Sequence, residues 1–136
     1  MSDEDSVAIV ISEGSYDKAM AGLFMATTAA GMGMQAHVFF TFFGLNLLKK
    51  GADPKLSGMY RLFTGTFKKK MKNVGIGSYQ ETLETAKDLG VKLYACNTTL
   101  NALGLKREEL VDGVDILGAA AFLDIASNAK VDLFLG

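Results

Sequence analysis

Short apolar runs recur along the chain and alternate with segments whose apolar residues have helical spacing. The runs predict strands at 7–12 (VAIVIS), 36–43 (AHVFFTFF), 91–96 (VKLYAC), 114–120 (VDILGAA) and 131–136 (VDLFLG). Helices or helical turns are expected between them, at 17–33, 45–50, 78–90, 97–113 and 124–130. Strands that alternate with helices predict an α/β fold, a three-layer α/β/α sandwich around a mostly parallel sheet of about five strands.

Polar residues mark the starts of two of these helices. Asp17 is a candidate N-cap for a helix that closes on Gly31 or Gly33. Ser78 precedes Glu81 by the spacing of a capping box. The stretch GIGSYQE at 75–81 could also cradle an anion at a helix start, although a hinge followed by a cap explains it more simply.

The segment at about 55–77 is basic and interrupts the alternation of strands and helices. Its apolar residues have helical spacing, weakened by Gly58 and Gly65: Met59, Leu62, Phe63, Phe67 and Met71. Its basic residues have no acidic residue among them: Lys55, Arg61, Lys68, Lys69, Lys70 and Lys72. One interpretation is the solvated face of an amphipathic helix. The other is a mobile flap that draws an anionic substrate or an acidic partner towards the functional site.

Composition narrows the class of protein. A chain of 136 residues is long enough for one core, so we expect a single domain over 1–136. The formal net charge of −1 disfavours binding to nucleic acid or to an anionic membrane. The longest apolar run, AHVFFTFFGLNLL, is shorter than a membrane span, and the acidic opening MSDEDS does not resemble a signal peptide. We therefore expect a cytoplasmic protein.

Cysteine and histidine each occur once, at Cys96 and His37. A single cysteine excludes an intramolecular disulfide, and one residue of each type is too few for a zinc site with four Cys or His ligands. His37 opens a strand and is expected to be structural, so no Ser-His-Asp arrangement is predicted. GMGMQA at 31–36 matches a dinucleotide-binding pattern, but it follows a helix instead of a strand and is interpreted as a turn.

The carboxyl ends of parallel strands meet at one edge of the sheet, where open α/β folds bind ligands. Residues 12–17, 41–46 and 96–99 are expected at that edge. Cys96 ends a strand there and precedes a helix start that Asn97, Thr98 or Thr99 can cap. Unpaired amides and the helix dipole at such a position favour a thiolate. The alternative is a buried, inert cysteine, and position alone leaves both open.

Two longer stretches resemble a known family. SYDKAMAGLFMATTAAGMGMQAHVFFTFFGLNLLKK (15–50) is similar to the opening of DsrE/DsrF-like sulfur-relay proteins. GVKLYACNTTLNALGLKREELVDGVDILG (90–118) is similar to their second signature, G-V-x-L-x-A-C followed by a G-[IL]-x-x-x-x-L segment. The resemblance runs from about residue 7 to 136 and favours the soluble DsrE-type proteins, some of which are labelled "peroxiredoxin family". The chain departs from the family at Phe43, where relatives have Trp, and at Thr98-Thr99, where many have Met-Ser or Thr-Ser.

The resemblance implies a DsrEFH-like, flavodoxin-like architecture and a role in sulfur trafficking. The family's cysteine accepts sulfane sulfur as a persulfide or thiosulfonate and exchanges it with TusA-type sulfur carriers and rhodaneses; the matching residue is Cys96. The implied substrate-binding residues are Asp17, Lys18, Thr41, Phe42, Gly44 and Asn46, beside Asn97, Thr98 and Thr99. Family members usually assemble as homo-oligomers, so a homo-oligomer is also implied. The basic segment would suit small anionic sulfur species, and the transfer chemistry requires no cofactor or metal.

Two other functions stay open at this point. A thiol peroxidase would agree with the peroxiredoxin label, but peroxiredoxins place their cysteine in P-x-x-x-[TS]-x-x-C, and the only proline, Pro54, is far from Cys96. The chain also lacks a resolving cysteine. The other possibility is a non-enzymatic oligomeric binding module in which Cys96 is incidental. Sulfur transfer needs an exposed cysteine of low pKa and little else, so the sulfur carrier is the leading prediction.

Overall fold

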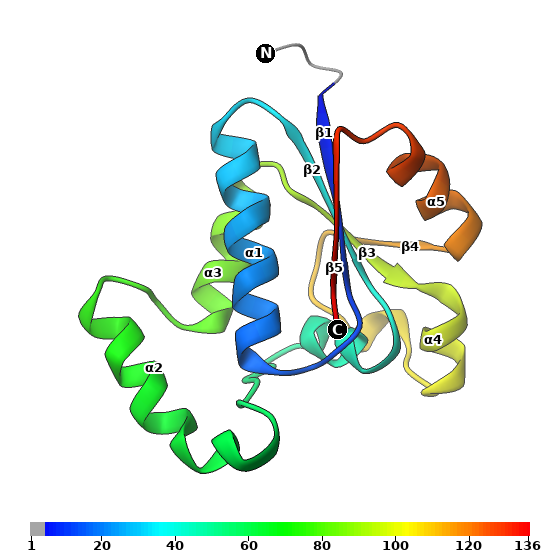
Figure 1. The fold of residues 1–136 in the computed structure, drawn as a ribbon. Helices are drawn as coiled ribbons and strands as arrows, with labels where there is room; N and C mark the ends of the chain where they lie inside the picture. The colour runs from blue at the N-terminus through cyan, green and yellow to red at the C-terminus, as the bar shows by residue number, and fades with distance from the viewer. Residues whose placement is uncertain (1–4) are drawn as a thin grey trace.

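The computed structural model describes residues 5–136 and contains one sheet of five parallel strands (Figure 1). The strands are β1 (Ser6–Ile11), β2 (Gln35–Phe40), β3 (Lys92–Cys96), β4 (Val114–Leu117) and β5 (Val131–Leu135). Their order is β4-β3-β2-β1-β5, and every neighbouring pair is parallel. The predicted sheet is confirmed, whereas most of the acidic opening segment lies in residues 1–4, outside the described residues.

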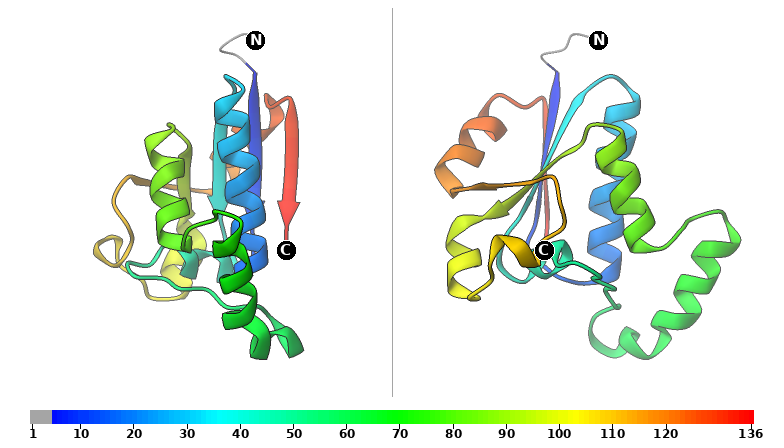
Figure 2. Two further views of the ribbon diagram at one scale, coloured as in Figure 1. Left: turned by 90° about the vertical axis from the view of Figure 1, so that its left-hand side faces the viewer. Right: turned by 180° about the vertical axis from the view of Figure 1, so that it is seen from behind.

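Helices cover both faces of this sheet (Figure 1 and Figure 2). Helices α1 (Tyr16–Gly31) and α3 (Tyr79–Asp88) pack on one face, and α5 (Ala119–Ser127) packs on the other. The short α4 (Asn97–Ala102) follows β3 directly. A large core lies under α1 and α3, and a smaller core of Ala8, Phe39, Tyr94, Cys96 and Phe122 involves α5. The three-layer α/β/α sandwich is therefore confirmed.

The inner strands are almost continuously apolar because both of their faces are covered. Ile9, Ile11 and Phe40 have no exposed surface, and each such side chain contributes roughly 1.5–3 kcal/mol by leaving water. The edge strand β5 is more open, with Val131 and Phe134 exposed. Among residues 5–136, no helix combines the length and the apolar character that a membrane span requires.

Two strands end earlier than the apolar pattern predicts. β2 stops at Phe40, because the next residue, Thr41, donates its N–H to the Ile11 carbonyl and the chain then turns into the 3-10 helix η1 (Phe42–Leu48). β4 stops at Leu117, and the alanine-rich stretch after Gly118 begins α5. The predictions of a strand at 114–120 and a helix at 124–130 are thus wrong at their bounds, since alanine is the strongest helix former.

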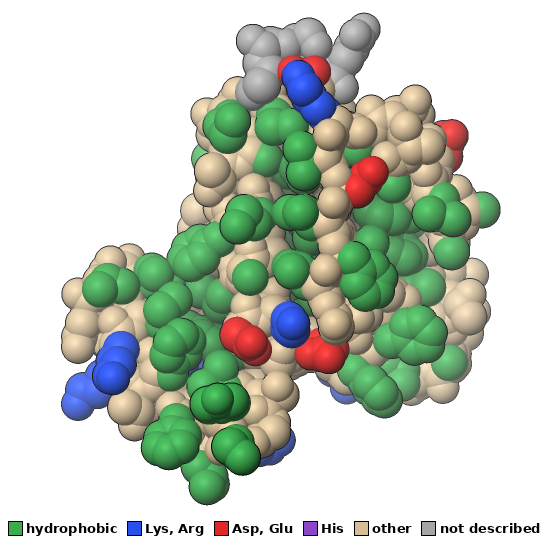
Figure 3. All heavy atoms as spheres, viewed as in Figure 1, with side chains coloured by type: hydrophobic (Ala, Val, Ile, Leu, Met, Phe, Trp, Pro, Cys, Tyr) green, Lys and Arg blue, Asp and Glu red, His purple; other side chains and the backbone are tan. Residues whose placement is uncertain are grey.

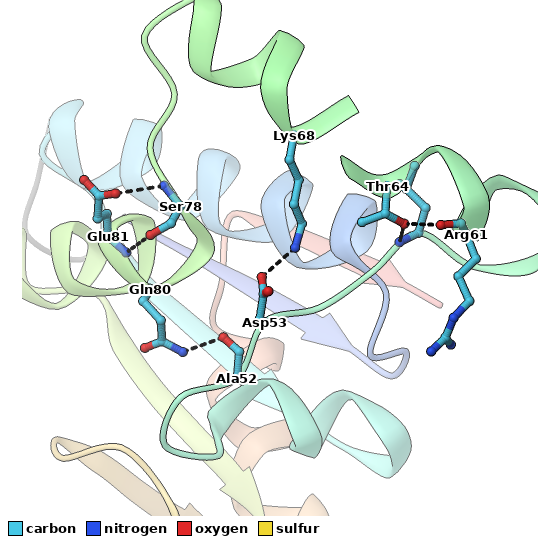
Figure 4. A network of polar contacts seen from close by, with 9 residues as sticks. Ala52, Asp53, Arg61, Thr64, Lys68, Ser78, Gln80 and Glu81 are labelled. Carbon is cyan, nitrogen blue, oxygen red and sulfur yellow. Dashed lines mark hydrogen bonds and ion pairs between the residues drawn. The ribbon is translucent and has the colours of Figure 1, made fainter. Parts of the chain in front are cut away.

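The basic segment forms two elements instead of one helix. A 3-10 helix, η2 (Gly58–Phe63), leads into α2 (Thr64–Asn73), and Gly58 has a positive φ of 63°. Residues 58–73, which we call the α2 projection, extend away from the sandwich (Figure 1). Lys68 holds the projection to the body through an ion pair with Asp53 at 2.5 Å (Figure 4).

The remaining helix bounds agree largely with the predicted ones. α1 is preceded by Ser15 as its N-cap, so the prediction of Asp17 as N-cap is wrong by two positions, and Gly33 follows the helix with a positive φ of 86°. The predicted capping box of α3 is confirmed: Ser78 and Glu81 each accept a hydrogen bond from the backbone N–H of the other. These bonds use N–H groups that an anion at GIGSYQE would have needed. A further 3-10 turn, η3, spans Arg107–Glu109.

Two glycines allow close approach between segments at the carboxyl edge of the sheet. A Cβ on Gly44 would overlap the carbonyl oxygen of Ile11, and a Cβ on Gly14 would lie 2.9 Å from the carbonyl oxygen of Phe43. Glycine is therefore required where the end of β1 and the loop after it meet η1.

We expect Gly44→Ala to lower the free energy of unfolding by about 1–3 kcal/mol, because the end of β1 and η1 must separate to admit the methyl group. Gly65→Ala is a matched control: it lies in α2 with open space around it, so it should keep or raise stability. Urea denaturation measures both variants. Wild-type stability of Gly44→Ala would show that this contact is dispensable.

Candidate functional site

The ends of β2 and β3 are joined by hydrogen bonds around one threonine. The backbone N–H of Phe42 donates to Thr99 Oγ1 at 3.0 Å, and Thr41 Oγ1 lies 3.3 Å from the same oxygen. Thr41 also joins β1 through its backbone N–H, which donates to the Ile11 carbonyl. Three strand ends that are distant in sequence therefore meet beside Cys96, as the parallel topology predicts.

Cys96 is both the last residue of β3 and the N-cap residue of α4, which confirms its predicted place in the fold. Its side chain is only 5% exposed and packs in the small core with Phe39, Tyr94 and Phe122. The sequence left a buried cysteine open as one alternative, and the structure shows that the thiol is buried. The physical reason is that β3 is an inner strand whose side chains are covered on both faces up to its end.

Hydrogen-bond donors nevertheless favour the thiolate of Cys96. Burial raises the pKa of the thiol, but the donors together outweigh burial and bring the pKa below its ordinary value. These donors are the backbone N–H of Thr99, the hydroxyl groups of Thr41 and Thr99, and the backbone N–H of Thr98. Because Thr99 Oγ1 already accepts from Phe42, its hydroxyl proton remains available to donate. Donors of this kind favour the charged form of a thiol even where burial opposes it.

A cavity of about 350 Å³ gives access to the buried thiol. Its apolar walls come from β2, the η1 turn, α4 and the start of α5: Phe39, Phe42, Phe43, Ala102, Leu103 and Ala119. Phe42 and Phe43 are 68% and 67% exposed, so they form the outer rim. No Lys, Arg, Asp or Glu lines this cavity. A small and weakly hydrated group can therefore reach Cys96 without unfolding the core.

Phe42 has an unusual backbone conformation, with a positive φ of 49°. For a bulky residue this costs on the order of 1–3 kcal/mol, and it persists only where surrounding contacts enforce it. Here the contact is the hydrogen bond from its N–H to Thr99, and the result is an exposed ring at the rim of the cavity. Strain of this kind is concentrated at functional sites.

The structure brings only some of the predicted site residues to Cys96. Thr41, Phe42, Thr98 and Thr99 line its cavity. The other predicted residues lie outside this lining: Asp17 and Lys18 in the first turns of α1, Gly44 against β1, Asn46 within η1, and Asn97 at the start of α4. Gly44 thus shapes the site through packing.

Several lining residues were missed by sequence reasoning. Phe39 belongs to β2 and was predicted only as part of a strand, and Phe43 was noted only as a departure from the family. Ala102 and Leu103 follow Thr98 and Thr99 by four residues, so they share one face of α4. That helical spacing was the available signal. Ala119 had no such signal, because its segment was predicted to be a strand.

The single histidine lies outside the lining of the Cys96 cavity. His37 Nδ1 lies 2.8 Å from the Tyr94 hydroxyl, and burial followed by the charge of Lys92 lowers the pKa of the imidazole. The prediction of a structural role agrees with this contact. Within residues 5–136, no three side chains among His, Cys, Asp and Glu gather as metal ligands.

Comparison with known proteins shows to which family the chain belongs. The sequence profile of the DsrE/DsrF/DrsH-like family matches residues 3–60 and 53–134, which together span nearly the whole chain. The chain belongs to this family. It is 33% identical to the sulfur carrier protein DsrE2 of Allochromatium vinosum, over 98% of this chain and 99% of that protein. It is 35% identical to the uncharacterized protein YrkE of Bacillus subtilis, over 93% of this chain and 94% of YrkE.

Solved structures support the fold of this DsrE-like chain. The ychN protein of E. coli superimposes with a TM-score of 0.71 at 17% identity, covering 96% of this chain and 98% of ychN. Protein MTH1491 of Methanobacterium thermoautotrophicum superimposes with a TM-score of 0.69 at 16% identity, covering 95% of this chain and 98% of that one. At these identities the comparison establishes the architecture alone.

We expect Thr99→Val to raise the pKa of Cys96 in this DsrE-like protein, because the variant removes a hydroxyl donor while keeping the shape of the side chain. Alkylation at pH 7 should slow by roughly tenfold or more, the effect of losing one hydrogen bond to a charged group. Thr98→Val is the matched control, since Thr98 contributes its backbone N–H and not its hydroxyl. Alkylation rates measured across pH test both variants. Equal rates for Thr99→Val and Thr98→Val would contradict the role of the Thr99 hydroxyl.

Proposed function

We propose that this DsrE-like protein carries sulfane sulfur on Cys96, as a persulfide or thiosulfonate, and exchanges it with small sulfur-carrier proteins. The observation that carries the proposal is the Cys96 thiol at the end of an apolar cavity, facing donors that lower its pKa. The name of the DsrE2 relative, a sulfur carrier protein, supports the same role. A reducing cytoplasm suits a chain whose single cysteine acts as a free thiol.

The transfer balances without a cofactor. The Cys96 thiolate attacks the outer sulfur of a donor R–S–SH, a new S–S bond forms at Cys96, and the old S–S bond breaks to release R–S⁻. The acceptor's thiolate then attacks the outer sulfur on Cys96 in the same way, and Cys96 leaves as a thiolate. Each step exchanges one S–S bond for another, so no net oxidant or reductant is consumed.

The cavity suits this chemistry in two respects. Sulfane sulfur is polarizable and weakly hydrated, so it loses little by entering a space lined by aromatic and aliphatic side chains. The donors around Cys96 lower the cost of having a thiolate there, both before loading and after sulfur has been passed on. Neither step needs a separate general base, because the attacking group is already deprotonated to a greater extent than a free cysteine.

Partner docking is assigned in this proposal to the α2 projection. Met59, Tyr60, Leu62 and Phe63 are 60–90% exposed on it, and hydrophobic side chains cover its surface in Figure 3. The same projection carries the basic residues Arg61, Lys68, Lys69, Lys70 and Lys72. An apolar patch and basic residues on one projection fit an acidic carrier protein of the TusA type or a rhodanese. The projection would act as the mobile flap of a single 1–136 domain.

A second apolar surface, on β5 and α5, supports self-association. Phe134 and Val131 on the edge strand β5 and Leu123 on α5 are exposed, and hydrophobic side chains gather over these elements in Figure 3. An open, apolar edge strand is a surface that proteins normally cover. We therefore include a homo-oligomer in the proposal, with the edge of β5 as its contact.

Sulfur loading is tested by intact mass after the reduced protein has been exposed to polysulfide. We expect a gain of about 32 Da, one sulfur atom, on the wild-type protein and none on Cys96→Ala, which has no thiol left. Tetrathionate should give a thiosulfonate adduct with the same dependence on Cys96.

The same assay separates the alternatives. Rapid turnover of hydrogen peroxide with a thiol donor, without a stable sulfur adduct, would indicate a thiol peroxidase. Absence of any Cys96 modification would overturn both functions and leave a binding module.

Transfer to a partner tests the docking surface. We expect Leu62→Ser to slow transfer from persulfidated protein to a TusA-type carrier by roughly fivefold, because Leu62 is 90% exposed and is the most exposed side chain of the apolar patch. Loading by polysulfide should not change. Leu89→Ser, an exposed leucine at the end of α3, is the matched control. Equal transfer rates for the two variants would place docking elsewhere.

A further inference from the structure

A second cavity adjoins the one that leads to Cys96. It has a volume of about 560 Å³, and Phe43 lines both cavities. The second cavity lies at the start of α1, between the loop after β1 and residues 53–61. Unlike the first cavity, it is lined by charged and polar side chains, among them Glu13, Ser15, Lys55, Ser57 and Arg61. The two cavities thus differ in polarity and share one residue, Phe43.

Ser15 in this second cavity has an unsatisfied hydroxyl group. Its side chain is 6% exposed, and its Oγ is the one buried side-chain oxygen or nitrogen within residues 5–136 that has no hydrogen-bond partner. Ser15 is the N-cap residue of α1, yet its hydroxyl makes no capping bond. Buried polar groups nearly always have partners, so an orphan in the lining of a cavity points to a bound group.

The start of α1 adds further donors. The backbone N–H of Tyr16 donates a hydrogen bond to the Lys55 carbonyl at 2.9 Å, so it is not free to bind a ligand. The next N–H groups of this 16-residue helix, at Asp17 and Lys18, have no partner within the helix. Such groups, together with the helix dipole, favour an anion. The Ser15 hydroxyl and these amides belong to the same turn.

The charges of the lining also favour an anion. Asp53 is occupied by its ion pair with Lys68, whereas Lys55 and Arg61 have no ion-pair partner within the described chain. Figure 4 shows the Arg61 side chain extending away from the Thr64 turn and separate from the Asp53–Lys68 pair. Glu13 is the other carboxylate of the lining, so outside the Asp53–Lys68 pair the lining carries two cations and one carboxylate. A guanidinium can also pair with both oxygens of a carboxylate or sulfonate.

We propose that the second cavity binds the anionic end of the sulfur donor while its sulfane sulfur enters the cavity of Cys96. The ligand class is an organic persulfide whose skeleton carries a carboxylate or sulfonate group. This inference rests on the proposed function. In the transfer step the Cys96 thiolate takes the outer sulfur, the donor's S–S bond breaks, and the thiolate R–S⁻ leaves with its anionic group still bound beside Arg61.

The test compares two persulfides that differ in charge. Glutathione persulfide has carboxylates, and the persulfide of N-acetylcysteamine has an uncharged skeleton. Loading rates of Cys96 are measured by intact mass for the wild-type protein, Arg61→Gln, Lys55→Gln and the control Lys70→Gln, whose lysine lies outside both cavities. All three side chains are at the surface, so the variants should fold.

We expect Arg61→Gln and Lys55→Gln to slow loading by glutathione persulfide about threefold to fivefold, the size of one partly screened charge contact. Loading by the uncharged persulfide should not change, and Lys70→Gln should resemble the wild-type protein with both donors. Added salt should reduce the difference between the donors. Ser15→Ala should also slow loading by the anionic donor. Its denaturation midpoint should not change, because the Ser15 hydroxyl makes no hydrogen bond in the unliganded protein.

Two outcomes would overturn the inference. One is an equal effect of Arg61→Gln on both donors, and the other is equal loading of Arg61→Gln and Lys70→Gln by the anionic donor. In either case loading by the uncharged donor would leave the sulfur-carrier function intact. Failure of both donors to load the wild-type protein would instead contradict the proposed function itself.

Discussion

The hydrogen bonds of the Thr99 side chain are the constraint on which the site depends. One oxygen accepts from the Phe42 backbone and contacts the Thr41 hydroxyl, so it ties the turn after β2 to the first turn of α4. The same hydroxyl lowers the pKa of Cys96. A single side chain therefore fixes the strained Phe42 at the cavity rim and stabilises the thiolate behind it. The conformation of Phe42 and the pKa of Cys96 therefore both depend on the Thr99 hydroxyl.

Burial raises the pKa of Cys96 and the surrounding hydrogen-bond donors lower it, and the arrangement of the site follows from the balance between the two. A thiol at the end of an inner strand is shielded from water and from large reagents, and desolvation alone would make it a poor nucleophile. The two backbone amides and two hydroxyls reverse that effect locally. The cavity then restores access for a small group only. In the proposed function, sulfane sulfur on Cys96 would be held away from bulk solvent and passed on through this cavity.

Features that follow from the order of the strands could be predicted from the sequence. A parallel α/β topology requires that loops after β1, β2 and β3 share one edge, so the place of Cys96 at a strand end and a helix start could be predicted. Burial of the thiol could not, because it depends on how Phe39 and Phe122 pack around it. The end of β2 was also misjudged, since Thr41–Phe43 is as apolar as the strand and only the hydrogen bonds of Thr41 reveal the turn. The unsatisfied Ser15 hydroxyl depends on a rotamer and had no signal in the sequence.

The most direct measurement is titration of the thiolate by its ultraviolet absorbance in the folded protein and in the chain unfolded by urea. The chain has one cysteine, so the thiolate signal belongs to Cys96 in both states. We expect the folded protein to titrate at a lower pH than the unfolded chain, because the donors at Thr41, Thr98 and Thr99 exist only in the fold. An equal or higher pKa in the folded protein would mean that burial prevails and would contradict an activated, sulfur-carrying Cys96.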